Sequence, residues 1–357
     1  MKTVINSLVE QYLETGVDFL HVDLDAYRDP ASQSEGPVHS RLALRREPLA
    51  EDADSSPKRL DFGMSHGAIP VDSDFQFGAD LELAAGEKQA LLFTQSLATV
   101  AKLKFLCKQQ SELTLIFVSE AASRFDLDFE LGENAELRLN LVLIENLELA
   151  KNLRLKQGPD ERAIQVQPHF TLEASARCDL HAVILDGNAS IKSQAELRAP
   201  GANFNYASAI FAHPQSQHSY EVETHHQAAK TFSQIRSHAV LDHDATVELI
   251  SRGRIERSAA GSQCRQDMKG ICLDETGTAL CYPLLFIDEY DIEASHASGV
   301  GQIDDDSLFY LMSRGLSEAE AKRLMMRAFL EAILTGVSDV ALSSFLHQRL
   351  DRMIEEC

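Results

Sequence analysis

His296 is the residue whose type and position most readily support metal chemistry. It follows Ser295 in an alternating run, DEYDIEASHA, that begins at Asp288. A neutral imidazole is a common iron ligand, and a histidine at a subunit boundary can complete a site that a partner's thiolate begins. The alternative is structural, since a histidine at a strand end often only hydrogen-bonds the adjacent turn. The residues by themselves favour this alternative.

Cys264 is the thiol with the strongest claim to a function. It lies in the polar run SQCRQD, where Arg265 could lower the thiol pKa modestly. Cys272 and Cys281 lie among apolar residues, where buried free cysteine behaves as a small hydrophobe. The spacing of the three cysteines is unlike that of stable cluster or zinc sites. We therefore expect core packing for Cys272 and Cys281, and we keep Cys264 as a weaker candidate ligand or sulfur acceptor.

Four histidines between residues 213 and 226 also suggest a metal site. They are His213, His218, His225 and His226. Strand alternation places adjacent His225 and His226 on opposite sheet faces, so they cannot easily share one ion. No HExxH motif or clear facial triad accompanies them. We predict a solvated face for this group, and a cupin-like metal enzyme is a distant alternative.

Short alternating runs from about residue 72 onward predict that β-strands position these side chains. Four of them begin with an alanine: AELRLNLVLIEN at Ala135, ARCDLHAVILDG at Ala176, ANFNYASAIFA at Ala202 and ATVELISRGRIE at Ala245. Two of the gaps between these alanines are close to multiples of twenty-odd residues, which suits a solenoid of stacked strands. An antiparallel β-sandwich explains the pattern equally well.

The chain becomes helical after the segment GVGQ at 299–302, which predicts a turn. Asp304, Asp305 and Asp306 provide acceptors for the start of a helix, and Gly315 suits its end. These signals predict a helix between residues 304 and 315.

Two further helices are expected beyond Gly315. Ser317 with Glu320 forms a capping box at the start of the first one. Its apolar stripe is predicted to run through Leu324, Ala328 and Phe329, with Met325 and Leu330 beside it. Ser338 is the predicted cap of the last helix, which carries Leu342, Phe345, Leu346, Arg349 and Met353.

Composition limits the function classes. The 357 residues include 33 basic and 55 acidic ones, and the net charge of −22 argues against binding to nucleic acid or to an anionic membrane surface. No apolar run approaches the roughly 20 residues that span a bilayer, and residues 4–20 predict a short amphipathic helix rather than a secretory leader. We expect a cytoplasmic protein, with a polar loop region at 28–60. Six cysteines do not suggest a disulfide framework.

The carboxy-terminal third of the chain resembles the SufB/SufD family, the scaffold subunits of the Suf machinery for iron–sulfur cluster assembly. The resemblance rests on Ser295-His296, on GVGQ at 299–302 and on LFYL and SRG at 308–315. It extends upstream to a histidine, threonine and serine at family spacing, and to a glutamine at the spacing found in SufD-like members. These residues are His226, Thr231, Ser233 and Gln266.

The resemblance implies a mainly β protein with a right-handed parallel β-helix core. It implies an amino-terminal helical and polar loop region at 1–71, the β-helix at 72–296 and a carboxy-terminal helical domain at 297–357. In this family SufB and SufD pair through their β-helices, and the helical domain of each binds one SufC-type ATPase. For this chain the resemblance implies docking of that ATPase by apolar helix residues, namely Leu308, Phe309, Leu324, Met325 and Phe329.

The SufD-like branch implies a subunit with no catalytic turnover and no stably bound cofactor. A transient iron–sulfur cluster would form at the interface with the SufB-type partner, where His296 is the expected ligand; a homodimer is possible when the chain is alone. Asp267 stands where SufB has a cysteine that accepts sulfur, and Ala294 stands where many SufD-like proteins have a cysteine. Because Cys264 is close to Asp267 in sequence, a SufB-like or self-pairing scaffold that accepts sulfur on Cys264 remains the alternative.

Overall fold

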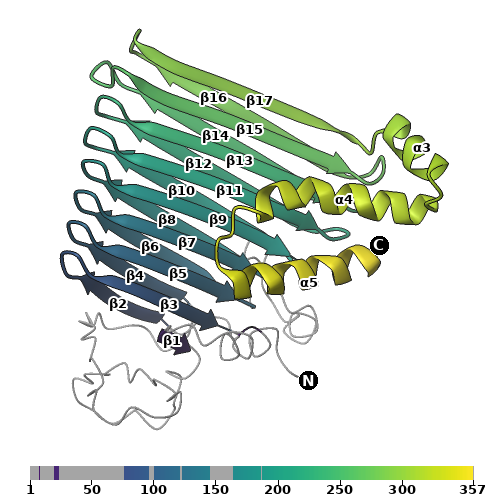
Figure 1. Cartoon of the computed structure of the whole chain (residues 1–357), viewed down its shortest axis with the longest axis horizontal. Coiled ribbons are helices and arrows are strands. Elements are labelled where there is room, and N and C mark those ends of the chain that lie inside the picture. The colour runs from purple at the N-terminus through teal and green to yellow at the C-terminus, as the bar shows by residue number, and fades with distance from the viewer. Residues whose placement is uncertain are drawn as a thin grey trace.

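Two facing parallel sheets make up most of the protein (Figure 1). The computed structural model describes Leu8 and residues 20–23, 76–95, 100–120, 123–144, 164–185 and 187–356. Sheet A contains β1 (Leu20–Asp23), β3 (Lys88–Gln95), β5 (Glu112–Ser119), β7 (Glu136–Leu143), β9 (Arg177–Leu185), β11 (Asn203–Ala212), β13 (Phe232–Leu241), β15 (Ser262–Cys272) and β17 (Ile292–Gln302). Sheet B contains β2 (Gln76–Leu83), β4 (Val100–Cys107), β6 (Arg124–Leu131), β8 (Ile164–Leu172), β10 (Ala189–Leu197), β12 (Gln217–His226), β14 (Thr246–Ile255) and β16 (Thr278–Ile287).

From β2 onward, consecutive strands alternate between the two sheets, so each sheet-B strand and the next sheet-A strand form one coil of a solenoid. Every strand pairing among the described residues is parallel. An antiparallel β-sandwich would pair neighbouring strands in opposite directions. The predicted parallel β-helix-like solenoid is therefore confirmed, and the sandwich alternative is wrong.

The four alanines that begin the alternating runs mark the corners of the coils. Ala135, Ala176, Ala202 and Ala245 each directly precede a strand and are fully buried, with 0% of their surface exposed. A small side chain is needed where the chain turns inward between the two sheets. The alanine spacing followed the coil length only approximately for two reasons. The coil from β7 to β9 includes residues 145–163, and Ala245 precedes a sheet-B strand whereas the other three alanines precede sheet-A strands.

The solenoid interior changes character along its axis. In the early coils one inward-facing column contains Phe105, Phe129 and Phe170, whose rings stack at centroid distances of 4.7 and 5.0 Å. The same column continues as Ala195, Thr224, Gly253 and Leu285. The later coils thus replace aromatic packing with smaller and more polar side chains, and the candidate site lies at that end.

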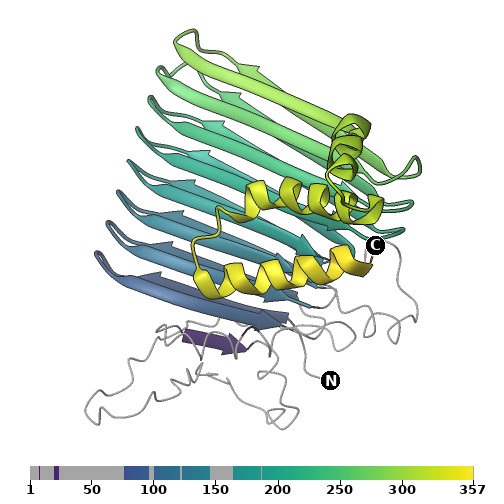
Figure 2. The same cartoon turned by 45° about the vertical axis from the view of Figure 1, so that its right-hand side comes forward.

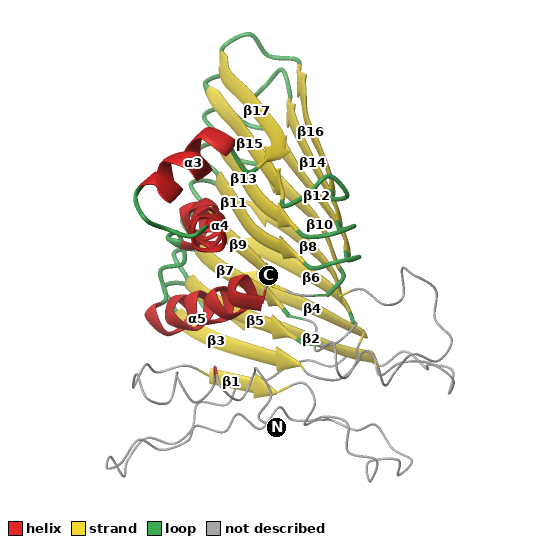
Figure 3. Ribbon diagram, turned by 90° about the vertical axis from the view of Figure 1, so that its right-hand side faces the viewer, coloured by secondary structure: helices red, strands yellow, loops and turns green. Residues whose placement is uncertain are grey.

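Three helices follow the last strand: α3 (Asp305–Ser313), α4 (Glu318–Leu334) and α5 (Val340–Glu356). Figures 2 and 3 show α4 and α5 lying across the outer face of sheet A. Their buried side chains join a second apolar cluster with outward-facing sheet residues such as Val183, Phe211 and Val240. The ring of His238 on β13 stacks on Phe329 of α4 at 4.5 Å. The two helices therefore share their core with the sheet.

The predicted helix signals are largely confirmed. Asp304 caps α3 by accepting a hydrogen bond from the Ser307 amide at 2.8 Å. Gly315 follows α3 with a φ of 101°, which L-residues rarely adopt. Ser317 and Glu320 form the predicted capping box of α4. The cap of α5 was wrong, because Asp339, not Ser338, accepts from the Leu342 amide at 2.8 Å.

The predicted apolar stripe of α4 is wrong in part, since Leu330 is buried and Phe329 packs against the cluster shared with sheet A, but the rest of the stripe is not buried. Leu324 and Ala328 are exposed, whereas the buried residues of α4 are Ala321, Met326, Leu330, Ile333 and Leu334. The sequence EAEAKRLMMRAFLEAIL has apolar residues on more than one side, and contact with sheet A selected a different side. On α5, Leu342, Phe345, Leu346 and Met353 are buried as predicted, and Arg349 is half-buried.

The predicted turn at 299–302 is part of a strand. Residues Gly299 to Gln302 continue β17 and pair with Lys269 to Cys272 of β15. The glycines fit there because β17 is the last strand of sheet A, and a Cβ at Gly299 or Gly301 would meet nothing within 4 Å. The solenoid strands thus reach Gln302, and β1 adds residues 20–23 to the other edge of sheet A.

The amino-terminal expectations mostly fall outside the described residues. Of the predicted helix at 4–20, the structure describes Leu8, which is helical and buried, and Leu20, which begins β1. The polar region at 28–60 lies entirely outside the described part of the chain. None of the described helices is long and apolar enough to span a membrane.

Candidate functional site at the open end of the solenoid

The last coil, formed by β16 and β17, has no described strand above it. Each of these strands is the final one of its sheet (Figure 3). Their inward-facing side chains, which would be core residues in any other coil, are half-buried or exposed. An uncapped coil presents both apolar side chains and unpaired backbone groups, which is a template for association with another chain.

His296 lies on the inner side of this open coil. It pairs in register with Gln266 of β15, which is buried in the solenoid interior with 3% of its surface exposed. The imidazole itself is exposed, because no strand in the described part of the chain covers it. Its Nδ1 lies 3.2 Å from the carbonyl oxygen of Pro283, across the coil on β16. The predicted site residue is thus on the surface where a partner could reach it.

Gln266 forms the layer directly beneath His296. Its Nε2 donates to the carbonyl of Leu284 at 3.2 Å. Its Oε1 is buried and has no hydrogen-bond partner among the described residues. An unpaired buried acceptor is unfavourable in the isolated chain. The sequence singled out Gln266 only by its family spacing, and the structure places it next to His296.

The other three family-matching residues form one buried hydrogen-bonded cluster. His226 Nδ1 lies 2.8 Å from Thr231 Oγ1, and His226 Nε2 lies 2.8 Å from Ser233 Oγ. Ser262 Oγ is 2.7 Å from Thr231 Oγ1, and Thr224 Oγ1 is 3.3 Å from Ser233 Oγ. Sequence analysis missed Thr224 and Ser262. Both are polar residues at inward-facing positions of alternating strands, which is unusual for a core. That they lie beside His226, however, could be known only from the strand register.

Burial holds the His226 ring neutral and gives a pH dependence of stability. Burial, with a smaller contribution from His225, lowers the pKa of His226 from its usual 6.5 to about 4. The unfolded state therefore binds more protons between these values, so stability is complete above the unfolded pKa and falls as pH drops toward 4. We expect this histidine to remove about 2 kcal/mol of unfolding free energy by pH 5. Urea unfolding at pH 7.5 and pH 5 would measure it, and a His226→Gln variant should lose less on acidification.

Cys264 is inaccessible, contrary to its polar sequence context. It faces the interior with 0% of its surface exposed, while Arg265 points to the opposite face of the sheet. Burial raises the pKa of the Cys264 thiol, so the expected lowering by Arg265 is wrong. Cys264 pairs in register with Ala294, one coil above it. A buried, protonated thiol cannot readily accept sulfur from another protein.

Gly253 makes room for the Cys264 thiol. A Cβ at position 253 would lie 2.5 Å from Cys264 Sγ and 3.0 Å from Leu285 Cδ2. We expect Gly253→Ala to destabilise the chain by about 1–3 kcal/mol in urea unfolding, because the core has no space for the methyl group. Adding Cys264→Ala should restore much of this loss, and a cycle of the two variants measures the coupling. Purely additive effects would show that the two side chains do not compete for space.

Cys272 and Cys281 behave as predicted. Cys272 is buried, and Cys281 is half-buried against the solenoid core. Burial raises the pKa of Cys281 to about 11, so the thiol is protonated at neutral pH. Asp267, by contrast, lies on the outer face of sheet A, where its Oδ2 accepts from Lys269 Nζ at 3.1 Å.

The solvated face predicted for the histidines at 213–226 is wrong in part. His218 and His226 are interior residues, and His218 bonds Tyr220 and Ser216 at 3.0 and 3.1 Å. His225 does point outward, as alternation predicted, and its Nε2 lies 2.7 Å from Glu256 Oε1. The described residues include no group of three histidine, cysteine or carboxylate side chains that could hold a metal ion. The metal-enzyme alternative therefore has no donor set here.

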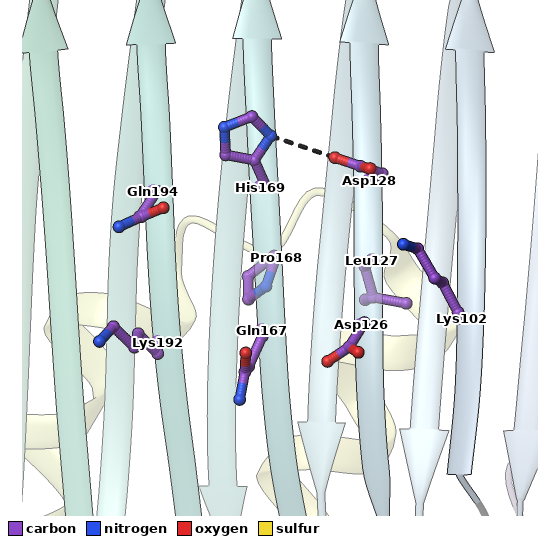
Figure 4. Close-up of a pocket in the computed structure, with 9 residues that line it drawn as sticks. All are labelled: Lys102, Asp126, Leu127, Asp128, Gln167, Pro168, His169, Lys192 and Gln194. Atoms are coloured by element: carbon purple, nitrogen blue, oxygen red, sulfur yellow. Dashed lines mark hydrogen bonds and ion pairs between the residues drawn. The ribbon is translucent and has the colours of Figure 1, made fainter.

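The outer face of sheet B carries charged side chains of both signs. A shallow hollow there is shown in Figure 4, where His169 Nδ1 lies 3.1 Å from Asp128 Oδ1. His169 Nε2 also lies 3.6 Å from Glu196 Oε1 on the next strand. The lining residues are Lys102, Asp126, Leu127, Asp128, Gln167, Pro168, His169, Lys192 and Gln194. These cross-strand pairs are a solvated structural ladder, well removed from the open end.

The outer face of β16 is apolar, unlike the rest of sheet B. Its outward-facing residues have 37–45% of their surface exposed and are Leu280, Tyr282, Leu284 and Phe286. The neighbouring inward residues of β16 are largely apolar too. A strand that is apolar on both faces is expected where both faces become covered. The run TALCYPLLFI contained this signal, which sequence analysis did not use.

Helix α3 presents the second exposed apolar surface. None of its residues is buried; Phe309 is 73% exposed and Tyr310 56%. Leu324 of α4 is 46% exposed, whereas Leu308 and Met325 are half-buried. Phe329 is engaged within the chain, since it packs against sheet A and His238. Of the residues predicted to dock a partner, Phe309 and Leu324 are the most accessible.

Comparison with known proteins finds similar sequences over much of this chain. Residues 108–329 match the family described as "SUF system FeS cluster assembly, SufBD core domain". The iron–sulfur cluster assembly protein SufD of Bacillus subtilis is 25% identical over 170 residues, covering 48% of this chain and 39% of that protein. The protein of the same name in Plasmodium falciparum is 32% identical over 147 residues, covering 41% of this chain and 10% of that protein.

A SufBD family protein of Archaeoglobus fulgidus is 33% identical over 108 residues, covering 30% of this chain and 28% of the relative. The matched segments thus span less than half the length of each of these relatives. The family match, however, covers more than half of this chain and includes β5 to β17, α3 and most of α4. The chain therefore belongs to the SufB/SufD family of iron–sulfur cluster assembly proteins, and within it the chain is SufD-like.

Proposed function

We propose that this chain is a SufD-like partner subunit for iron–sulfur cluster assembly, without catalytic turnover of its own. In this proposal the open coil pairs with a SufB-type scaffold and α3 binds a SufC-type ATPase. The observation that carries it is the pair of separate apolar surfaces, one on β16 and one on α3, in a chain of this family. Large exposed apolar residues in a protein with a net charge of −22 favour protein partners over nucleic acid.

The scaffold would add its strands to the free edges of β16 and β17. Edge strands offer unpaired N–H and C=O groups, and the outward-facing apolar side chains of β16 would be covered on docking. A second copy of this chain could use the same edges when the scaffold is absent. In this proposal the functional complex is the heterodimer of this chain with the SufB-type scaffold.

The nascent cluster is cargo at this interface, and His296 would supply one ligand from this chain. A neutral imidazole suits iron, and a partner's thiolates would supply the remaining ligands. Cys264 is not included, because its thiol is fully buried.

The ATPase would cover the exposed side of α3. We expect Phe309→Asp to reduce capture of the SufC-type ATPase at least tenfold while leaving scaffold capture unchanged, because Phe309 is 73% exposed and contributes little to the core. Pull-down from a co-expression of the three proteins would measure both effects. Val340→Asp is the matched control, since Val340 is 79% exposed at the start of α5.

The test of the whole proposal is co-expression of the tagged full-length chain with both partners, followed by affinity capture and sizing. A stable three-protein complex supports it. Failure of the full-length chain to hold either partner would refute it. Surface substitutions are better probes than truncation, because α4 and α5 cover apolar residues of sheet A.

A further inference from the structure

The bond between His296 and Pro283 determines which ring nitrogen of His296 is free. Nδ1 lies 3.2 Å from the Pro283 carbonyl oxygen, and the described residues give the ring no other hydrogen bond. A carbonyl oxygen can only accept, so a neutral ring must carry its proton on Nδ1 to make this bond. Nε2 then retains its lone pair and is the nitrogen able to bind a metal ion.

Pro283 is suited to this role by its place at the sheet edge. β16 pairs with β14 on one side and with no described strand on the other. Proline lacks an N–H and is tolerated on an edge strand when that side faces away from the ladder. In a strand the N–H and C=O of one residue point the same way, so the Pro283 carbonyl also faces the free edge. His296 therefore takes a carbonyl that the sheet-B ladder does not use.

Gln266 binds the next carbonyl along the same strand. Its Nε2 donates to the Leu284 carbonyl oxygen at 3.2 Å, which holds the carboxamide against β16. Successive carbonyls of a strand point in opposite directions. Gln266, in the coil below, therefore reaches the Leu284 carbonyl, whereas His296, in the last coil, reaches the Pro283 carbonyl. Gln266 and His296 are neighbours in register, and their side chains hydrogen-bond the carbonyls of two consecutive residues of β16.

We propose that Pro283 is the positioning residue of His296: its carbonyl holds the ring as the Nδ1–H tautomer and leaves Nε2 available at the open end for a metal ion. The role of that ion as cluster iron rests on the proposed function; the tautomer does not. The pair also interrupts strand addition. Pro283 offers an incoming strand neither an N–H nor a free carbonyl, so the ladder must break beside His296 and leave space for a ligand there.

Nitrogen-15 NMR of full-length protein labelled at its 13 histidines tests the assignment directly. Protonated and unprotonated ring nitrogens differ widely in chemical shift, and at about pH 8.5 an ordinary imidazole is neutral. The spectrum of His296→Asn identifies the His296 signals by difference. We expect a protonated Nδ1 and an unprotonated Nε2. The opposite tautomer, or a mixture of both, would overturn the proposal.

Two further measurements separate positioning from coincidence. Pro283→Ala keeps the carbonyl and should leave the tautomer unchanged, so a switch in that variant would contradict a role for the carbonyl. Titration with Zn²⁺ as the probe metal should shift the Nε2 signal of His296, and binding through Nδ1 would overturn the inference. If the chain captures no scaffold but shows the Nδ1–H tautomer, the proposed function fails and the tautomer assignment stands.

Discussion

Replacing Leu284 with aspartate is expected to reduce capture of the SufB-type scaffold at least about 100-fold, equivalent to roughly 3 kcal/mol. Leu284 lies on the outer face of the edge strand β16 with 38% of its surface exposed, flanked by Tyr282 and Phe286. A carboxylate placed there must be desolvated when a partner covers the strand, and a charge on an edge strand opposes pairing. Affinity capture with purified scaffold, followed by titration, would measure the loss.

The variant should remain folded, because the Leu284 side chain is directed away from the solenoid core. Its unfolding midpoint is expected close to that of the unmodified chain, and its ATPase capture should be unchanged. Val340→Asp, at an exposed apolar position on α5, should affect neither partner. Undiminished scaffold binding by a folded Leu284→Asp chain would remove β16 from the interface.

Deleting α4 and α5 is expected to abolish cooperative folding rather than to release an intact solenoid. Four buried side chains of α4 and seven of α5 belong to the apolar cluster that these helices share with sheet A. Each large side chain contributes about 1.5–3 kcal/mol on burial, and the net stability of a domain is only about 5–15 kcal/mol. A chain ending at Leu316 should therefore aggregate or bind a hydrophobic dye, as sizing and fluorescence would show.

A pair of single substitutions gives the same test without truncation. Leu346→Asp places a charge at a position with 0% exposure, and it should lower the unfolding free energy by at least 3 kcal/mol. Gln348→Asp changes an exposed position of the same helix and should be neutral. A soluble, cooperatively unfolding chain that lacks both helices would contradict the shared core.

Sequence patterns predicted the local secondary structure better than they predicted which strands and helices contact one another. The alternating runs gave the strands, and Asp304, Gly315, Ser317 and Glu320 gave helix ends, because these signals act within a few residues. Whether the strands stacked in parallel or paired in a sandwich depended on contacts between residues far apart in the chain. Alternation alone does not contain that information, so only the family resemblance favoured the solenoid.

The candidate site shows the same limit. His296 was identified from its sequence motif, yet its register with Gln266 and its bond to Pro283 required the stacking of β15, β16 and β17. Cys264 looked accessible because its neighbours are polar, but those neighbours alternate between interior and outer face. The apolar face of α4 was misplaced for a related reason, since sheet A selected one of several possible faces.

Hydrogen–deuterium exchange of the full-length chain, with and without a SufB-type scaffold, would show whether the open coil pairs with that scaffold. We expect amides in 278–302 to become protected when the scaffold is added, with Pro283 at a break in the protected segment. Amides of α3 should be unaffected until the SufC-type ATPase is also present. Protection confined to another face of the solenoid, or no change at 278–302 in a complex that forms, would contradict pairing through the open coil.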